Sequence, residues 1–293
     1  MKSLWLIVVF VVLSGCKQDE SSVAVHNASV ELALHVPAQE TIKTSAVKFS
    51  KECMVNLGLC WYRIGSSANE KDLPSVTIKS ADRTLGFQNV TGVTVVVDDQ
   101  VGKDIENIDV TLRALPDNST HEQNRDFIYK IIENIKSSGW KHYYSPGDPR
   151  ISGSNSSNID SPGKVLGHYV SSHPWFDPDY VIDMNRWRKV SSFYSWYFYS
   201  EGDYLTLKAW RRNSNDDPAT RGTYLITMEF KTEREFWLSE FSGNNDRANW
   251  KELLPARLNK YKDARRVIED EARASGMEID ESYQDPPIQA LSK

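Results

Sequence analysis

An aromatic stretch in the second half of the chain most strongly constrains the fold. Ser192–Ser200 reads Ser-Phe-Tyr-Ser-Trp-Tyr-Phe-Tyr-Ser, Glu201-Gly202-Asp203 supplies turn residues, and Tyr204–Arg212 returns in a second extended run. Thr223–Phe230 has the composition of a third strand. Aromatic and β-branched runs bounded by turn formers are typical of an antiparallel meander. Because aromatic residues fall on both alternating sets of positions, we expect both faces of this sheet to be partly covered.

An amphipathic helix is predicted upstream of the meander. Its apolar positions recur at helical spacing: Phe127, Ile128, Ile131, Ile132 and Ile135. Ser119 and Glu122 have the spacing of a capping box, and Gly139 is a suitable stop. A second helical segment is expected near the C-terminus, where Asp246 could cap a helix that contains Trp250.

These patterns predict an α+β protein with antiparallel sheets, a central amphipathic helix and a C-terminal helical segment. Strand-like runs precede the central helix, among them Val90–Val97 and the alternating Ile108–Leu112. Residues 145–190 are rich in proline and glycine, which indicates an irregular excursion or a domain junction. We therefore expect an N-terminal α+β subdomain over 40–145 and a C-terminal meander with helices over 146–293. Whether these are one domain or two stays open.

The N-terminus combines a positive residue, a short apolar core and small residues before a cysteine. The apolar run is too short for a bilayer, which needs about 20 residues, and is typical of a secretory signal. The sequence Leu13-Ser14-Gly15-Cys16 resembles the lipobox of bacterial lipoproteins. That resemblance implies a signal peptide over 1–15, a lipid on Cys16 and a tether over 16–39. The alternatives are an ordinary signal peptide and, within Val30–Val36, a first strand.

The residue after the lipobox cysteine bears on location. It is Lys17 rather than aspartate. By resemblance to Gram-negative lipoproteins, a residue other than aspartate favours sorting to the outer membrane. In a Gram-negative host we therefore expect a body that faces the periplasm and is attached to the membrane through its N-terminal lipid.

Assigning Cys16 to lipid leaves two of the three cysteines, Cys53 and Cys60. Disulfides persist in the oxidising compartments outside the cytoplasm. Positions seven apart on a helix lie about 10.5 Å apart, beyond the ~7 Å that a disulfide spans between Cα atoms. A bridge therefore requires a turn, for which Asn56 and Gly58 are suitable. Two free thiols and a metal pair are the alternatives, and the metal pair lacks nearby histidine ligands.

Composition and motifs exclude several functional classes. The chain is 40% hydrophobic with a formal net charge of −5, so it can build a core but lacks the basic footprint of nucleic-acid binding. It contains neither a glycine-rich phosphate loop nor a His-Glu-x-x-His zinc motif. We expect no cofactor and no nucleic-acid partner.

Catalytic candidates are few. His168 and His173 are the closest histidine pair, with Asp177 and Asp183 nearby in a turn-rich segment. These four residues could form a metal site. A serine hydrolase with a hydroxyl from Gly153–Ser157 is a second possibility, but it needs a base and an orienting acid at hydrogen-bond distance. Solvated loop positions are the commoner explanation. We predict no metal site, no catalytic residue and no enzymatic activity.

The aromatic meander has two interpretations, a sheet core or a recognition face. Arginine stands beside tryptophan at two places near it, and Tyr, Trp and Arg dominate binding hot spots. The candidate partner-binding residues are Arg186, Trp187, Trp196, Trp210 and Arg211.

Several segments between residues 50 and 290 carry a family resemblance: Leu115–Gln123 with the helix to Trp140, Asp148-Pro149-Arg150, Phe176–Tyr180, Arg221–Tyr224 and Ile279–Tyr283. With the lipobox, they resemble the lipoprotein immunity proteins encoded beside type VI secretion phospholipase effectors. This resemblance implies a periplasm-facing lipoprotein that binds a toxic phospholipase and inhibits it sterically. It assigns no catalytic residue. The alternatives are an envelope hydrolase that uses His168 and His173, and a structural component of an envelope assembly.

Overall fold

The computed structural model describes residues 28–99 and 101–292. The signal peptide, Cys16 and the tether up to residue 27 lie outside the described residues. The tether does not extend to residue 39 as expected, because Ser29–Ala33 form strand β1 and Ala38–Thr44 form helix α1. The alternative, a first strand within Val30–Val36, is confirmed in its first half.

The described elements follow in chain order. The first half holds β1 and α1, then β2 (Ser50–Met54), η1 (Val55–Leu57), β3 (Leu59–Gly65), β4 (Ser75–Ser80), β5 (Arg83–Phe87), β6 (Val90–Asp98), β7 (Asn107–Leu112), β8 (Ser119–Thr120), α2 (His121–Ser137) and β9 (Lys141–His142). The second half holds η2 (Gly153–Asn158), β10 (Lys164–Val165), β11 (His168–Tyr169), η3 (Pro174–Phe176), α3 (Met184–Lys189), β12 (Phe193–Ser200), β13 (Asp203–Asn213), β14 (Arg221–Thr232), α4 (Glu233–Leu238), α5 (Asn244–Ala248), α6 (Trp250–Ala274) and η4 (Gln289–Leu291).

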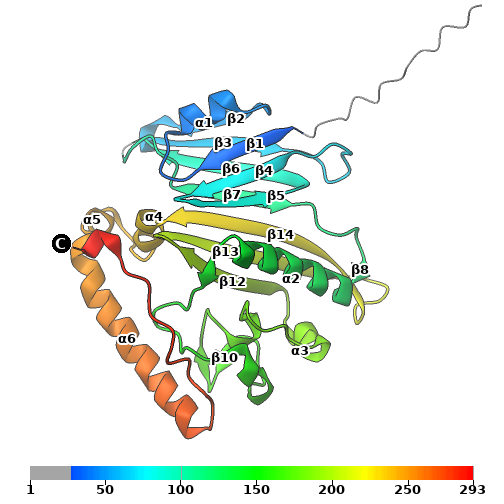
Figure 1. The fold of residues 1–293 in the computed structure, drawn as a ribbon, viewed down its shortest axis with the longest axis vertical. Helices are drawn as coiled ribbons and strands as arrows, with labels where there is room; N and C mark the ends of the chain where they lie inside the picture. Colours follow the sequence, from blue (N-terminus) through cyan, green and yellow to red (C-terminus); the bar gives the residue numbers. More distant parts are fainter. Residues whose placement is uncertain (1–27, 100, 293) are drawn as a thin grey trace, which may run out of the picture.

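The predicted α+β class is confirmed, and one large sheet dominates it. Its strand order is β2-β3-β6-β7-β14-β13-β12-β9, with β8 added beside β14. A smaller sheet of order β1-β4-β5 lies with the first half of the chain (Figure 1). Because β7 pairs with β14, strands from 40–145 and from 146–293 form a single sheet. The large sheet is therefore continuous across the boundary at residues 145–146 that the sequence suggested.

The predicted meander corresponds to β12, β13 and β14, and its register follows from a tight hairpin. Glu201 and Gly202 both have positive φ, 48° and 96°, as a two-residue turn compatible with strand twist requires. This turn places Ser200 opposite Asp203 and Phe193 opposite Trp210. Burial then alternates along each strand, so every second side chain faces the inner core.

Helix α2 covers the inner face of this sheet, where Figure 1 shows it lying across β13 and β14. Ile128, Ile132 and Ile135 are fully buried, so the predicted amphipathic helix is confirmed. Its capping box is one residue later than expected: Thr120 accepts from the backbone N–H of Gln123, whose side chain accepts from the Thr120 N–H. The small β1-β4-β5 sheet contributes to the same inner core.

Among the described residues, a second apolar cluster covers one end of the outer face of the sheet. There Tyr204 and Tyr143 pack with Trp237 of α4 and with Trp250 and Leu254 of α6. Figure 1 shows α6 extending away from the half of the molecule that holds β1–β7. Among residues 28–99 and 101–292, none of the helices combines the length and apolar character needed to span a bilayer.

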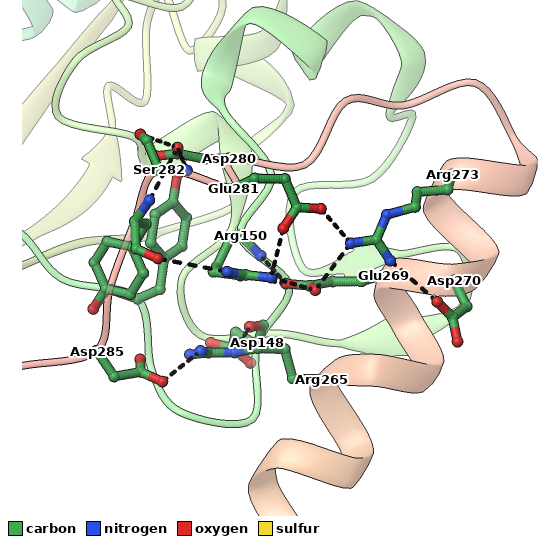
Figure 2. Close-up of polar contacts among 12 residues, drawn as sticks. Asp148, Arg150, Arg265, Glu269, Asp270, Arg273, Asp280, Glu281, Ser282 and Asp285 are labelled. Carbon is green, nitrogen blue, oxygen red and sulfur yellow. Dashed lines mark hydrogen bonds and ion pairs between the residues drawn. The ribbon is translucent and has the colours of Figure 1, made fainter.

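Charged side chains hold the C-terminal segment and α6 against the loop after β9 (Figure 2). Arg150 donates two hydrogen bonds to the buried carboxylate of Glu269, from Nε at 2.8 Å and from Nη2 at 2.9 Å, and also contacts Glu281. Burial acts to raise the pKa of Glu269, but the hydrogen bonds from Arg150 hold that pKa below its usual value. Arg265 joins the same segments by an ion pair with Asp285 at 2.8 Å.

The predicted disulfide joins Cys53 of β2 to Cys60 of β3. The two cysteines are directly opposite in the antiparallel pair, and their Cα atoms are 4.1 Å apart. The required turn is η1, and it ends at Gly58 with a φ of 69°.

Replacing both cysteines, Cys53→Ala with Cys60→Ala, should lower the free energy of unfolding. The chain-entropy cost of closing so short a loop corresponds to about 2.5 kcal/mol. Urea denaturation of wild type and variant measures the difference. Reductant should bring the wild type to the stability of the variant and leave the variant unchanged; equal midpoints for the two proteins without reductant would refute this role.

Candidate functional site

Three of the expected partner-binding residues lie in the core. Trp187 and Trp196 are fully buried on the inner side of the sheet. Arg211 is also buried, and its guanidinium donates to the carbonyl of Trp187 at 3.2 Å and to the hydroxyl of Tyr194 at 2.7 Å. These three side chains therefore bind α3 to the sheet and do not contact a partner in this conformation. The alternative interpretation, an aromatic core, is confirmed for Tyr194, Trp196 and Phe198.

The other two candidates are more accessible. Arg186 is partly exposed, but its Nε donates to the carbonyl of Ser156 at 2.9 Å and its Nη1 pairs with Asp183. Trp210 is 41% exposed on the outer face of β13. Of the five residues, Trp210 is therefore the one whose apolar ring is available to another protein.

Trp210 belongs to an exposed apolar row that crosses three strands. Phe193 of β12 lies directly opposite Trp210, and Trp210 lies directly opposite Leu225 of β14. Phe193 is 70% exposed and Leu225 is 45% exposed. Directly opposite side chains on one sheet face have Cβ atoms about 4.5–5.5 Å apart, so the three form a continuous patch, here called the outer row. Phe193 belongs to the aromatic meander for which the sequence allowed a recognition face, whereas Leu225 carries no sequence signal of its own.

Charged residues occupy the outer face beyond this row. Glu229 of β14 accepts from the Lys208 ammonium at 2.7 Å and pairs with Lys231 at 2.7 Å. Burial acts to raise the pKa of Glu229, but the two lysines hold it below its usual value. Asp109 of β7 lies directly opposite Glu229. Burial, reinforced by the charge of Glu229, raises the pKa of Asp109 to about 6.

The alternative site at His168 and His173 is not assembled among the described residues. His168 bonds to Glu271 of α6 at 2.9 Å, whereas buried His173 accepts from the backbone N–H of Trp175 and caps η3. Burial lowers the pKa of His173 to about 4. Asp183 caps α3. The Ser154 hydroxyl bonds to Ser152 and the Ser157 hydroxyl to Asn158, whereas the buried Ser156 hydroxyl has no partner among the described residues. None of these three hydroxyls bonds to a histidine of the described chain.

A polar cavity of about 420 Å³ lies at the edge of the sheet beside β9. His142 of β9 and Asp177 of the η3 loop face each other there, with His142 Nδ1 3.5 Å from the Asp177 carboxylate. Burial lowers the pKa of His142. His142 carries no sequence signal for this site, because its neighbours in the fold are distant in the chain and form no local motif with it.

Comparisons with protein-family models, with curated proteins and with solved structures gave no match. The functional inference therefore depends on the site geometry and on the resemblance described above.

Replacing Asp109 with asparagine should stabilise the protein at neutral pH. The folded-state pKa of about 6 exceeds the usual 3.8, so the folded protein binds more protons in this interval. The contribution of this group to stability consequently falls as the pH rises from 3.8 to about 6. Asp109→Asn removes that loss, and its advantage over wild type should be largest above pH 6.

Denaturant unfolding across this pH range measures the effect. Asp72→Asn, at an exposed position, is the control and should change little. A wild type that gains stability relative to Asp109→Asn as the pH rises would contradict the expectation.

Proposed function

We propose that the chain is a lipid-anchored envelope protein that binds an antibacterial phospholipase and inhibits it, giving self-immunity to the cell that makes the lipase. The outer row carries this proposal. Phe193, Trp210 and Leu225 present apolar side chains from three hydrogen-bonded strands. Such a surface can bind a protein without first ordering a loop, so little of the binding free energy is lost to conformational entropy.

The surroundings of the outer row suit a protein interface. Stable complexes typically have an aromatic, desolvated centre with a polar rim and bury about 1,600 Å² in total. Lys208 lies beside Trp210 along the exposed side of β13, and Glu229 and Lys231 follow on the same face. The apolar side chains of the outer row would provide most of the affinity for the partner. The surrounding charges would orient the partner on the sheet.

The proposed location has separate support. The Cys53–Cys60 disulfide suits an oxidising compartment, where such bonds persist. The lipobox resemblance at Cys16 suits the same compartment and adds a membrane anchor. The segments that resemble immunity lipoproteins support a phospholipase as the partner.

Inhibition would be steric. A rigid sheet face placed over the mouth of the lipase active site, or against its lid, excludes phospholipid without chemistry of its own. The net charge of −5 would speed association with a basic partner surface. The purified chain should therefore abolish phospholipid hydrolysis by the lipase encoded beside it at a one-to-one ratio; full lipase activity in its presence would end the proposal.

Removing the central ring of the outer row should weaken binding. Trp210→Ala should raise the Kd for the lipase about 30-fold, which corresponds to the ~2 kcal/mol of a hot-spot residue. Tyr169→Ala is the matched control, because Tyr169 is also an aromatic residue on a strand and is 81% exposed, but lies on the β10–β11 hairpin. Titration calorimetry measures both affinities.

Two results would place the interface elsewhere. One is an unchanged affinity for Trp210→Ala. The other is a larger loss for Tyr169→Ala than for Trp210→Ala, which would assign the contact to the hairpin.

Removing the lipid attachment residue should abolish membrane attachment without changing the affinity for the lipase. Cys16→Ser should retain the fold and the affinity for the lipase, because the contacts proposed for binding lie on β12–β14. It should move from the membrane fraction to the soluble fraction on cell fractionation. A variant that stays membrane-bound would show that Cys16 is not the anchor.

A further inference from the structure

The cavity beside β9 is lined by four segments that are distant in the chain, one of which contributes Ser152, Ser154 and Asn155. His142 lies on β9, and Tyr144 follows two residues later. Asp177 and Asp179 lie in the loop that follows η3, and Asp280 lies in the C-terminal segment. Glu278 adds a further carboxylate to the lining. Lys136 pairs with Asp179. The cavity therefore gathers more negative than positive charge among the residues that line it, which favours a cation.

Three side chains are placed to share one ion. His142, Asp177 and Asp179 each offer a ligand atom, and these atoms all lie within 4.8 Å of one another. Around a tetrahedral ion with donor distances of 2.0–2.2 Å, any two donors lie about 3.3–3.6 Å apart. Side-chain rotations that close gaps of up to about 1.5 Å would therefore bring the three donors to one ion.

Backbone hydrogen bonds orient the Asp177 carboxylate, one of the three donors. The Asp177 carboxylate accepts from the backbone N–H of Gly153 at 2.6 Å and from that of Asp179 at 2.8 Å. Hydrogen bonds of this kind fix ligating carboxylates and tune their affinity for metal. Each Asp177 oxygen keeps a further lone pair for an ion.

A buried aromatic ring fixes the position of His142. Tyr144 is only 2% exposed, lines the cavity, and its ring lies 4.1 Å from that of His142, centroid to centroid. Its backbone N–H donates to the hydroxyl of Tyr283 at 3.3 Å, which holds this part of the chain beside the C-terminal segment.

We propose that His142, Asp177 and Asp179 bind a divalent transition-metal cation, for which Zn²⁺ is the best chemical match. Imidazole favours zinc and its neighbours over calcium and magnesium, and the set contains no thiolate that would select copper(I). Three protein ligands leave one position of a tetrahedral ion for water. The Tyr144 hydroxyl could hydrogen-bond to that water. The ion would join β9 to the η3 loop, apart from the outer row.

The test uses the full chain, untagged, purified in detergent and treated with a chelator. Titration calorimetry with ZnCl₂ should show one ion per chain, and saturating Zn²⁺ should raise the melting temperature. His142→Gln should weaken Zn²⁺ binding at least tenfold and abolish the thermal shift. His168→Gln is the matched control, because His168 also pairs with a carboxylate but lies on the β10–β11 hairpin; it should bind like wild type.

Asp179→Asn provides a second variant that should fold normally, because its side chain is 57% exposed and pairs with Lys136. It should also weaken Zn²⁺ binding at least tenfold. Absence of saturable Zn²⁺ binding by wild type would overturn the proposal. Undiminished binding by both His142→Gln and Asp179→Asn would do the same, as would a loss seen only in His168→Gln.

Discussion

The pairing of β14 with both β13 and β7 is the constraint on which the rest of the structure depends. All eleven residues of β13 are paired with β14, and the other edge of β14 pairs with β7 from the first half of the chain. This strand therefore joins what would otherwise be two small sheets. The joined sheet is broad enough for α2 and the β1-β4-β5 sheet to bury its inner face. The helices of the C-terminal region cover only one end of the outer face.

Because the outer face is covered at one end, the exposed apolar surface of the outer row lies apart from the polar cavity beside β9. The outer row displays large apolar side chains on three strands that are hydrogen-bonded to one another, as a rigid binding surface requires. The polar cavity lies at the β9 edge, where η3 and the C-terminal segment meet. The Arg150–Glu269 pair and the Arg265–Asp285 pair hold that C-terminal segment in place (Figure 2). Binding at the outer row and stability around the cavity can therefore be altered independently.

Local patterns predicted the elements better than their assembly. Apolar periodicity identified α2 and the meander, and cysteine spacing with a turn identified the Cys53–Cys60 bridge. Whether the two β regions form one sheet stayed open, because the β7–β14 pairing joins distant segments that carry no local signal. Three of the five candidate partner-binding residues are buried, because composition does not show which way a side chain points. Trp196 lies opposite Leu207 and faces inward, whereas Trp210 lies opposite Phe193 and faces outward.

Site-specific photocrosslinking would test most directly whether the outer row is the binding surface. A photoreactive phenylalanine analogue is placed at Leu225 in one protein and at Tyr169 in another, and each is irradiated with the phospholipase encoded beside the chain. We expect a one-to-one covalent adduct from position 225 and none from position 169. An adduct from position 169 alone, with lipase activity fully inhibited in both samples, would show that inhibition uses another surface.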